Sequence, residues 1–187
     1  MQEPERILFL TKDIDEESSS EIIKAIVNIN YYDDEKEKEI IEYTRSPIIL
    51  NICTNGGLID YAVSIYDLIK TSKTPIWAYA SGIVASAGFL ILISADKRFS
   101  YENTDILYHQ ASFGLSRRTV KEASRISEHM NATEEKLEKI VLKNTKIRKQ
   151  DLDFVNERNQ DWHMTTQEAL ELGVIDEIIK NKERKFK

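Results

Sequence analysis

Three polar residues, far apart in the sequence, have side chains of the types that a nucleophilic hydrolase combines: Ser86, His109 and Asp161. Ser86 stands at the start of an expected apolar helix, where backbone N–H groups favour a developing negative charge. A serine at a helix start is more often a simple N-cap, and Val84 takes the place of the first glycine in the GxSxG nucleophile pattern. The position of Ser86 alone therefore leaves both roles open.

A general base for this serine has three candidates among the histidines. His109 closes an expected strand with apolar neighbours, His129 lies in a charged helix, and His163 precedes a helix start. Asp105 shares the strand of His109, but four strand residues span roughly 13 Å, too far for a hydrogen bond between the two side chains. Asp161 is therefore the better candidate for an orienting carboxylate. Neither His109 nor His163 has a second ligand at HxH or HxxxH spacing, so no metal site is predicted.

Four of the six glycines cluster in two segments, residues 54–57 (Thr-Asn-Gly-Gly) and residues 82–88 (Gly-Ile-Val-Ala-Ser-Ala-Gly). Each segment follows an expected strand and opens an expected helix. Glycine there permits a positive φ and a close approach of the backbone, which an N–H group aimed at a ligand requires. Ordinary strand-to-helix turns use glycine in the same way. Neither segment fits GxGxxG or GxxxxGK, so a nucleotide phosphate is not the expected ligand.

The composition argues against several classes of protein. The chain has 187 residues and a formal net charge of −6, from 26 basic and 32 acidic side chains, which argues against a nucleic-acid-binding module. Cys53 is the only cysteine, so neither an intramolecular disulfide nor a CxxC zinc site is possible. No apolar stretch reaches the roughly 18 residues of a membrane span, and the apolar run at 7–10 is too short for a signal peptide. The sequence predicts a soluble, cytoplasmic protein.

The apolar pattern alternates short strands with amphipathic helices, which predicts a single α/β domain over residues 1–187. Strands are expected at residues 6–11, 48–52, 76–80 and 174–179 and, as a pair, within 98–108. Helices are expected after Asp15, at about 58–72, from Ser86, at 116–145, and from Thr165. The residues at 165–168, Thr-Thr-Gln-Glu, have the spacing of a capping box. The charged residues 31–38 are expected to form a solvated loop.

Taken together, these segments resemble the proteolytic subunit of the ATP-dependent Clp protease (ClpP), a family of serine peptidases. Residues 54–57 are similar to the family's Ser-Pro-Gly-Gly loop, and residues 82–88 to its Gly-x-Ala-Ala-Ser-Met-Gly nucleophile motif. The pair formed by His109 and Gln110 matches the block with the catalytic histidine, and Asp161 resembles the start of the block with the catalytic aspartate. The ordered set of blocks extends over most of the chain.

The resemblance implies a role for five residues. Ser86 would be the nucleophile, His109 its general base, and Asp161 the group that holds the imidazole in the right tautomer. The oxyanion hole would come from the backbone N–H groups of Gly57 and Ala87. The implied reaction is hydrolysis of peptides or unfolded proteins through an acyl-enzyme on Ser86, with no cofactor and no metal.

The resemblance also implies an α/β fold of the ClpP/crotonase type, a stack of ββα units with a protruding handle at about residues 110–145. Family members form heptameric rings that pair face to face and receive substrate from an AAA+ unfoldase. Here the family's glycine-rich segment, residues 110–118, has one glycine and two arginines. The family's aromatic docking positions for the unfoldase are Ile49, Asn51 and Thr71 in this chain. Ring pairing and unfoldase docking therefore stay open.

Two other functions remain alternatives. A catalytically weak structural subunit of a mixed ring would keep the fold and assemble without contributing a working site. A crotonase-like acyl-CoA enzyme would use the same two-segment oxyanion hole for a thioester enolate. That class needs no Ser-His-Asp set, so the filled triad positions count against it.

Overall fold

The structure of the protein, a computed structural model, describes residues 2–111, 119–158 and 160–180. Its strands are β1 (Ile7–Leu10), β2 (Ile48–Thr54), β3 (Ile76–Ala85), β4 (Lys97–Tyr101), β5 (Asp105–Tyr108), β6 (Trp162–Met164) and β7 (Glu177–Ile179). Its helices are α1 (Glu16–Glu39), α2 (Ile59–Thr71), α3 (Ala87–Leu92), α4 (Val120–Asn144), α5 (Lys149–Glu157) and α6 (Thr166–Glu171). The predicted α/β class is confirmed.

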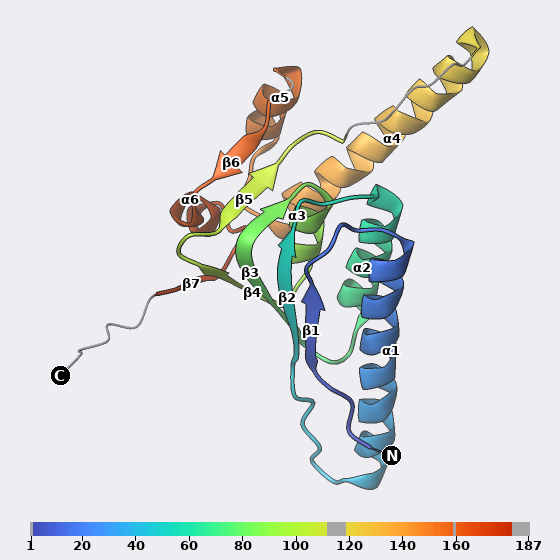
Figure 1. Ribbon diagram of the computed structural model, residues 1–187, viewed down its shortest axis with the longest axis vertical. Coiled ribbons are helices and arrows are strands. Elements are labelled where there is room, and N and C mark those ends of the chain that lie inside the picture. The colour runs from blue at the N-terminus through green and yellow to red at the C-terminus, as the bar shows by residue number, and fades with distance from the viewer. Residues whose placement is uncertain (1, 112–118, 159, 181–187) are drawn as a thin grey trace, which may run out of the picture.

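All the described strands belong to one sheet, which divides at β3. The strands run parallel in the order β1-β2-β3-β4-β7, and only β6 is antiparallel to its neighbour, β5. The first half of β3 pairs with β4, and its last residues pair with β5. Figure 1 shows α1 and α2 side by side along the sheet, whereas α4 projects away from it as a long arm. The long β3 therefore carries its C-terminal end out of the main sheet and toward β5 and β6.

The core forms between this sheet and the helices. In β2 the residues Ile48, Leu50 and Ile52 are fully buried and alternate with partly exposed neighbours, as expected for a strand with one face in the core. All six residues of α3 are buried, which explains why this segment is apolar on every side. Both the end of β3 and the whole of α3 are buried. The turn between them, which contains Ser86, is therefore fixed at each end by the core.

The prediction of a loop at residues 31–38 is wrong, because α1 continues through them. Ion pairs one turn apart support the charged end of this helix: Lys36 with Glu39 at 2.7 Å and Lys38 with Glu35 at 2.6 Å. Within the same stretch Asp33 is fully buried and accepts hydrogen bonds from three side chains of other segments. The charge run therefore forms the last turns of α1, with Asp33 as its buried anchor.

Other expected boundaries also shift. Residues 82–85, expected as part of a loop, extend β3 as far as Ala85. The structure adds α5 and the short β6, neither of which was predicted. Asp15 caps α1 and Thr165 begins the capping box of α6, both as expected, and the structure adds a capping box with Ser18 at Asp15. The start of the helix expected at 116–145 and the glycine-poor segment at 112–118 lie outside the described residues.

Candidate active site

Ser86 occupies a strained turn between β3 and α3. Its φ is 54° and its ψ −121°, a conformation that costs a non-glycine residue about 1–3 kcal/mol. Its N–H donates to the carbonyl of Leu107 at 3.0 Å, and its own carbonyl accepts from the N–H of Phe89 at 3.0 Å. Its side chain makes no capping hydrogen bond to the described part of α3. The simple N-cap role is therefore not what this serine performs; the turn holds its hydroxyl free at the end of a strand, as in strained strand-to-helix nucleophile turns.

The glycine segment after β2 lies directly against this turn. Gly56 has a φ of 108°, and a Cβ placed on it would lie 2.7 Å from the Cβ of Ser86 and 3.1 Å from the backbone nitrogen of Ala87. Gly57 has a φ of 149°, and a Cβ there would overlap the backbone of Ile14. Only glycine allows the backbone to come this close to the serine on one side and to residue 14 on the other.

Two backbone N–H groups, one in the glycine segment and one at the start of α3, have no acceptor among the described residues. Around Gly57, the N–H of Gly56 donates to Thr54 Oγ1 at 3.1 Å, and that of Leu58 donates to the carbonyl of Ile14 at 2.7 Å. The N–H of Gly57 itself has no acceptor among the described residues. The N–H of Ala87 is the first of α3, where no acceptor exists within the helix. These are the two donors that the resemblance to the ClpP family implies for an oxyanion hole.

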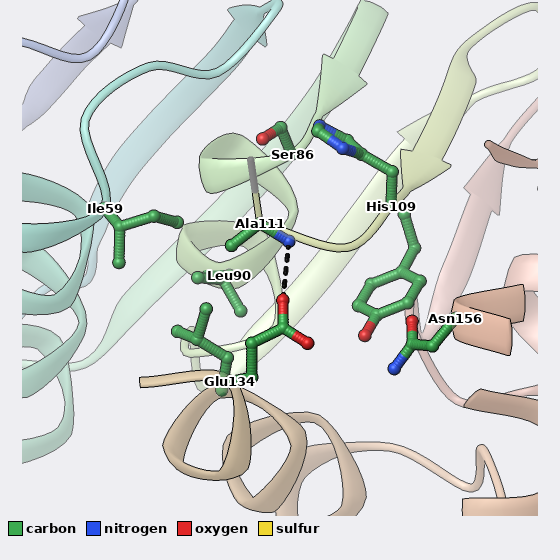
Figure 2. Close-up of a pocket in the computed structure, with 9 residues that line it drawn as sticks. Ile59, Ser86, Leu90, His109, Ala111, Glu134 and Asn156 are labelled. Carbon is green, nitrogen blue, oxygen red and sulfur yellow. Dashed lines mark hydrogen bonds between the residues drawn. The ribbon is translucent and has the colours of Figure 1, made fainter. Parts of the chain in front are cut away.

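His109 follows β5 and lies next to the serine. The register of β3 and β5 sets Ala85 opposite Leu107, two residues before the histidine. Ser86 and His109 line one pocket, and Figure 2 shows the imidazole pointing toward Ser86. No hydrogen bond joins the two side chains in the described structure. Catalytic hydrogen bonds are often long before a substrate binds, so this spacing is compatible with a serine–histidine pair.

Asp161 is brought close to His109 by a strand pairing that the sequence did not predict. In the antiparallel ladder of β5 and β6, Tyr108 faces Trp162. One further residue along each strand places Asp161 beside His109. The carboxylate is exposed, and within the described chain it makes no hydrogen bond to the imidazole. The two residues are thus neighbours in the fold without being joined.

The remaining histidines and Asp105 lie elsewhere in the described chain. His163 binds Asp105 through Nδ1, at 3.0 Å to Oδ2, and the two side chains are 56% and 44% exposed. Asp105 is therefore the partner of His163, which is consistent with the sequence argument that Asp105 is too far from His109 to bond to it. His129 is exposed on α4, as expected. The described residues contain no group of three or more His, Cys, Asp or Glu side chains that could hold a metal ion, and their helices include none that could cross a membrane.

The Clp protease family model matches residues 2–182 of the chain. The chain belongs to the Clp protease family. It is 31% identical over 97% of its length to an ATP-dependent Clp protease proteolytic subunit of Streptococcus mutans, of which 88% is covered. It is 29% identical over 95% of its length to a subunit with the same name from Streptococcus sanguinis, of which 86% is covered. The identities, near 30%, show a diverged member of this family.

The fold agrees with that membership. A solved structure of a ClpP1 mutant from Listeria monocytogenes matches with a TM-score of 0.78, covering 95% of this chain and 92% of the other, at 23% identity. The predicted fold type, a ClpP/crotonase-like stack with a protruding handle helix, is confirmed.

Two residues of the site have no counterpart in the sequence predictions. Glu134 from α4 and Asn156 from α5 line the same pocket as Ser86 and His109. Glu134 Oε1 accepts the N–H of Ala111 at 3.1 Å, and Oε2 accepts from Gln110 Nε2 at 2.5 Å. Both residues lie in helices with many charged and polar side chains. Nothing in the sequence around them therefore marks either one as a residue of the site. Only the packing of α4 and α5 against the end of β5 reveals them.

Proposed function

We propose that this Clp protease family member is a serine endopeptidase that hydrolyses peptide bonds through an acyl-enzyme on Ser86. The observation that carries the proposal is the strained turn at Ser86. The Ser86 side chain makes no capping hydrogen bond to the described part of α3, and the imidazole of His109 points toward Ser86 (Figure 2). The N–H groups of Gly57 and Ala87 have no acceptor among the described residues. A serine without this function would not need a conformation that costs about 1–3 kcal/mol.

In the first half of the reaction, His109 takes the proton of Ser86 Oγ as the oxygen attacks the peptide carbonyl. The carbonyl oxygen becomes negatively charged, and the N–H groups of Gly57 and Ala87 stabilise it. Each such donor is typically worth about 3–4 kcal/mol of the barrier. His109 then gives its proton to the leaving amine, and the acyl group stays on Ser86.

In the second half, water replaces the amine and the same groups work in reverse. His109 removes a proton from the water, the hydroxide attacks the ester, and Ser86 recovers its proton as the acid leaves. Asp161 is proposed to orient the imidazole and to stabilise the imidazolium that forms in each half. No metal and no organic cofactor takes part.

The chain is proposed to work as a subunit of a homo-oligomeric ring, a heptamer or a pair of heptamers, that encloses the sites in a chamber. Its relatives are named as proteolytic subunits of an ATP-dependent protease, which supports an AAA+ unfoldase as a partner that delivers unfolded protein. The proposed peptidase domain spans residues 1–187, with its handle at about 110–145, of which α4 is the described helical part. A chain with one cysteine fits the reducing cytoplasm, the proposed compartment.

A catalytically weak structural subunit is the second candidate. It is favoured by one observation: among the described residues no hydrogen bond joins Ser86 to His109 or His109 to Asp161. In this alternative the chain would complete a mixed ring whose other subunits cleave the substrate, and loss of the Ser86 hydroxyl would change neither assembly nor the partner's activity.

Native mass spectrometry after treatment with a fluorophosphonate distinguishes the two candidates, with Ser86→Ala as the control. An adduct on the wild type alone, on a multi-subunit species, is the expected result for an assembled serine hydrolase. An assembled protein that carries no adduct supports the structural subunit and contradicts the peptidase proposal. A thermal shift on addition of an acyl-CoA, without an adduct, would instead support the crotonase-like alternative.

A further inference from the structure

The pocket beside Ser86 and His109 has an acidic wall. Besides those two residues, it is lined by Ile59, Leu90, Tyr108, Ala111, Glu134, Leu137 and Asn156. Figure 2 shows Ser86 and His109 at one side and Glu134 reaching in from α4 on the opposite side, with Leu90 and Ile59 flanking the space. A side chain that entered this pocket from a peptide bound at Ser86 would therefore pass apolar groups and meet a carboxylate.

The charge of Glu134 has no cationic partner in the described part of the chain. The carboxylate is half-buried, and its two donors, the N–H of Ala111 and the amide of Gln110, are both neutral. Its field reaches the pocket wall: burial, and after it the charge of Glu134, raises the pKa of Tyr108 to about 12. A carboxylate in such surroundings binds a cation more strongly than it would in open solvent.

A second acceptor in the same pocket also lacks a donor. Asn156 Oδ1 is buried and has no hydrogen-bond partner among the described residues. A buried acceptor without a donor is unfavourable, and such atoms are rare in folded proteins. Glu134 thus lines the space as a charged acceptor, and Asn156 Oδ1 is an enclosed neutral acceptor in the wall of the same pocket. The group that satisfies both is a donor with several N–H bonds and a positive charge, an ammonium or a guanidinium.

We propose that this pocket selects the residue on the acyl side of the scissile bond and that Glu134 makes it prefer lysine or arginine. The inference rests on the proposed peptidase function. The aliphatic stem of such a residue would lie against Leu90, Leu137 and Ile59, and its charged head would meet Glu134 and Asn156. The cavity volume is about 30 Å³, room for one or two water molecules. The unbranched side chain of lysine or arginine would need to widen this narrow space less than a branched or aromatic side chain would.

Glu134 also has a positioning role, because it holds the segment that follows His109. Two variants separate this role from the charge. Glu134→Gln keeps an oxygen that can accept the N–H of Ala111 and removes the charge. Glu134→Leu removes both. Glu135→Gln is the matched control, because Glu135 is the next residue of α4, is exposed, and only pairs loosely with Lys139 at 3.9 Å.

The experiment compares kcat/KM for peptides that differ only in the residue before the scissile bond: lysine, glutamine or leucine. We expect the wild type and Glu135→Gln to cleave the lysine peptide at least tenfold better than the leucine peptide. In Glu134→Gln the lysine-to-leucine ratio should fall at least tenfold. Raising the salt concentration should lower the ratio in the wild type less than it would for an exposed pair, because the pocket is partly closed to solvent.

The possible outcomes test the preference of the pocket for lysine or arginine separately from the proposed peptidase activity of Ser86. An active wild type with equal rates for the three peptides, or a Glu134→Gln variant with an unchanged ratio, overturns the pocket inference and leaves the peptidase proposal standing. If Ser86 is labelled by a fluorophosphonate but no peptide is cleaved, the same ratio is measured from the labelling rates of phosphonates with aminobutyl and butyl side chains. Absence of both cleavage and an adduct overturns the proposed function and the inference together.

Discussion

Replacement of Gly56 by alanine tests whether the glycine segment is built to approach the serine. At a φ of 108° an L residue is strained by about 1–2 kcal/mol. The new Cβ would also lie 2.7 Å from the Cβ of Ser86, so the turn must open by about 0.7 Å to reach an ordinary contact of 3.4 Å. Overpacking of this kind costs about 1–3 kcal/mol. Together these effects should lower the free energy of unfolding by about 2–5 kcal/mol, or Tm by about 4–20 °C.

The same displacement should lower the rate of Ser86 labelling by a fluorophosphonate about tenfold to a hundredfold, because a misplacement near 1 Å can cost about a hundredfold. Gly82→Ala is the control. Gly82 also has a positive φ, 62°, but its Cβ would meet only the Cys53 sulfur, at 3.0 Å. We expect that variant to lose about 1–2 kcal/mol and to be labelled within about threefold of the wild type. If the two variants are equally stable and are labelled at equal rates, the glycine segment does not support the serine turn and the argument fails.

Three further predictions concern carboxylates. Asp161→Asn should reduce peptide hydrolysis by up to about 10⁴-fold, whereas Asp105→Asn should change it by less than about threefold; equal losses would mean that Asp161 is not the orienting group. Asp33→Asn should lower the free energy of unfolding, measured in urea, by about 3–5 kcal/mol, because it leaves the guanidinium of Arg6 without its buried partner; a loss below 1 kcal/mol would contradict this. Burial would raise the pKa of Asp33, but hydrogen bonds from Arg6, Thr74 and Tyr43 outweigh it and hold the pKa below its usual value. The wild type should therefore keep this contribution above about pH 4 and lose it as the pH falls further, and Asp33→Asn should show a smaller loss in acid.

The parts of the site that the sequence predicted are those determined by local patterns. Ser86 and the two glycine segments lie where a strand gives way to a helix, and both the residue types and the spacing are visible within a few positions. The structure adds the reason for the spacing, since Gly56 and Ser86 come into direct contact from different strands. A local pattern can show that a turn is unusual, but not which other turn lies against it.

The wrong prediction of a loop at residues 31–38 arose because the local pattern there was judged by composition and not by the spacing of its charges. A dense run of charges is typical of a loop when it is read as composition, but here the charges are spaced for contacts one helical turn apart. The buried Asp33 could not be recognised because its donors, Arg6, Tyr43 and Thr74, come from three separate segments. A residue type that is almost never buried alone becomes stable in the core only when such partners converge on it.

The neighbours of His109 could not be predicted for a related reason. Asp161 reaches it through β6, a strand of three residues that is too short to show an alternating pattern. Glu134 contacts the residues after His109 from α4, the helix that also projects from the sheet. The histidine therefore lies between a short strand pairing and the base of the arm. Because Glu134 joins α4 to Gln110 and Ala111, the two residues after His109, we expect contacts that the arm makes in the proposed ring to alter the position of the proposed general base.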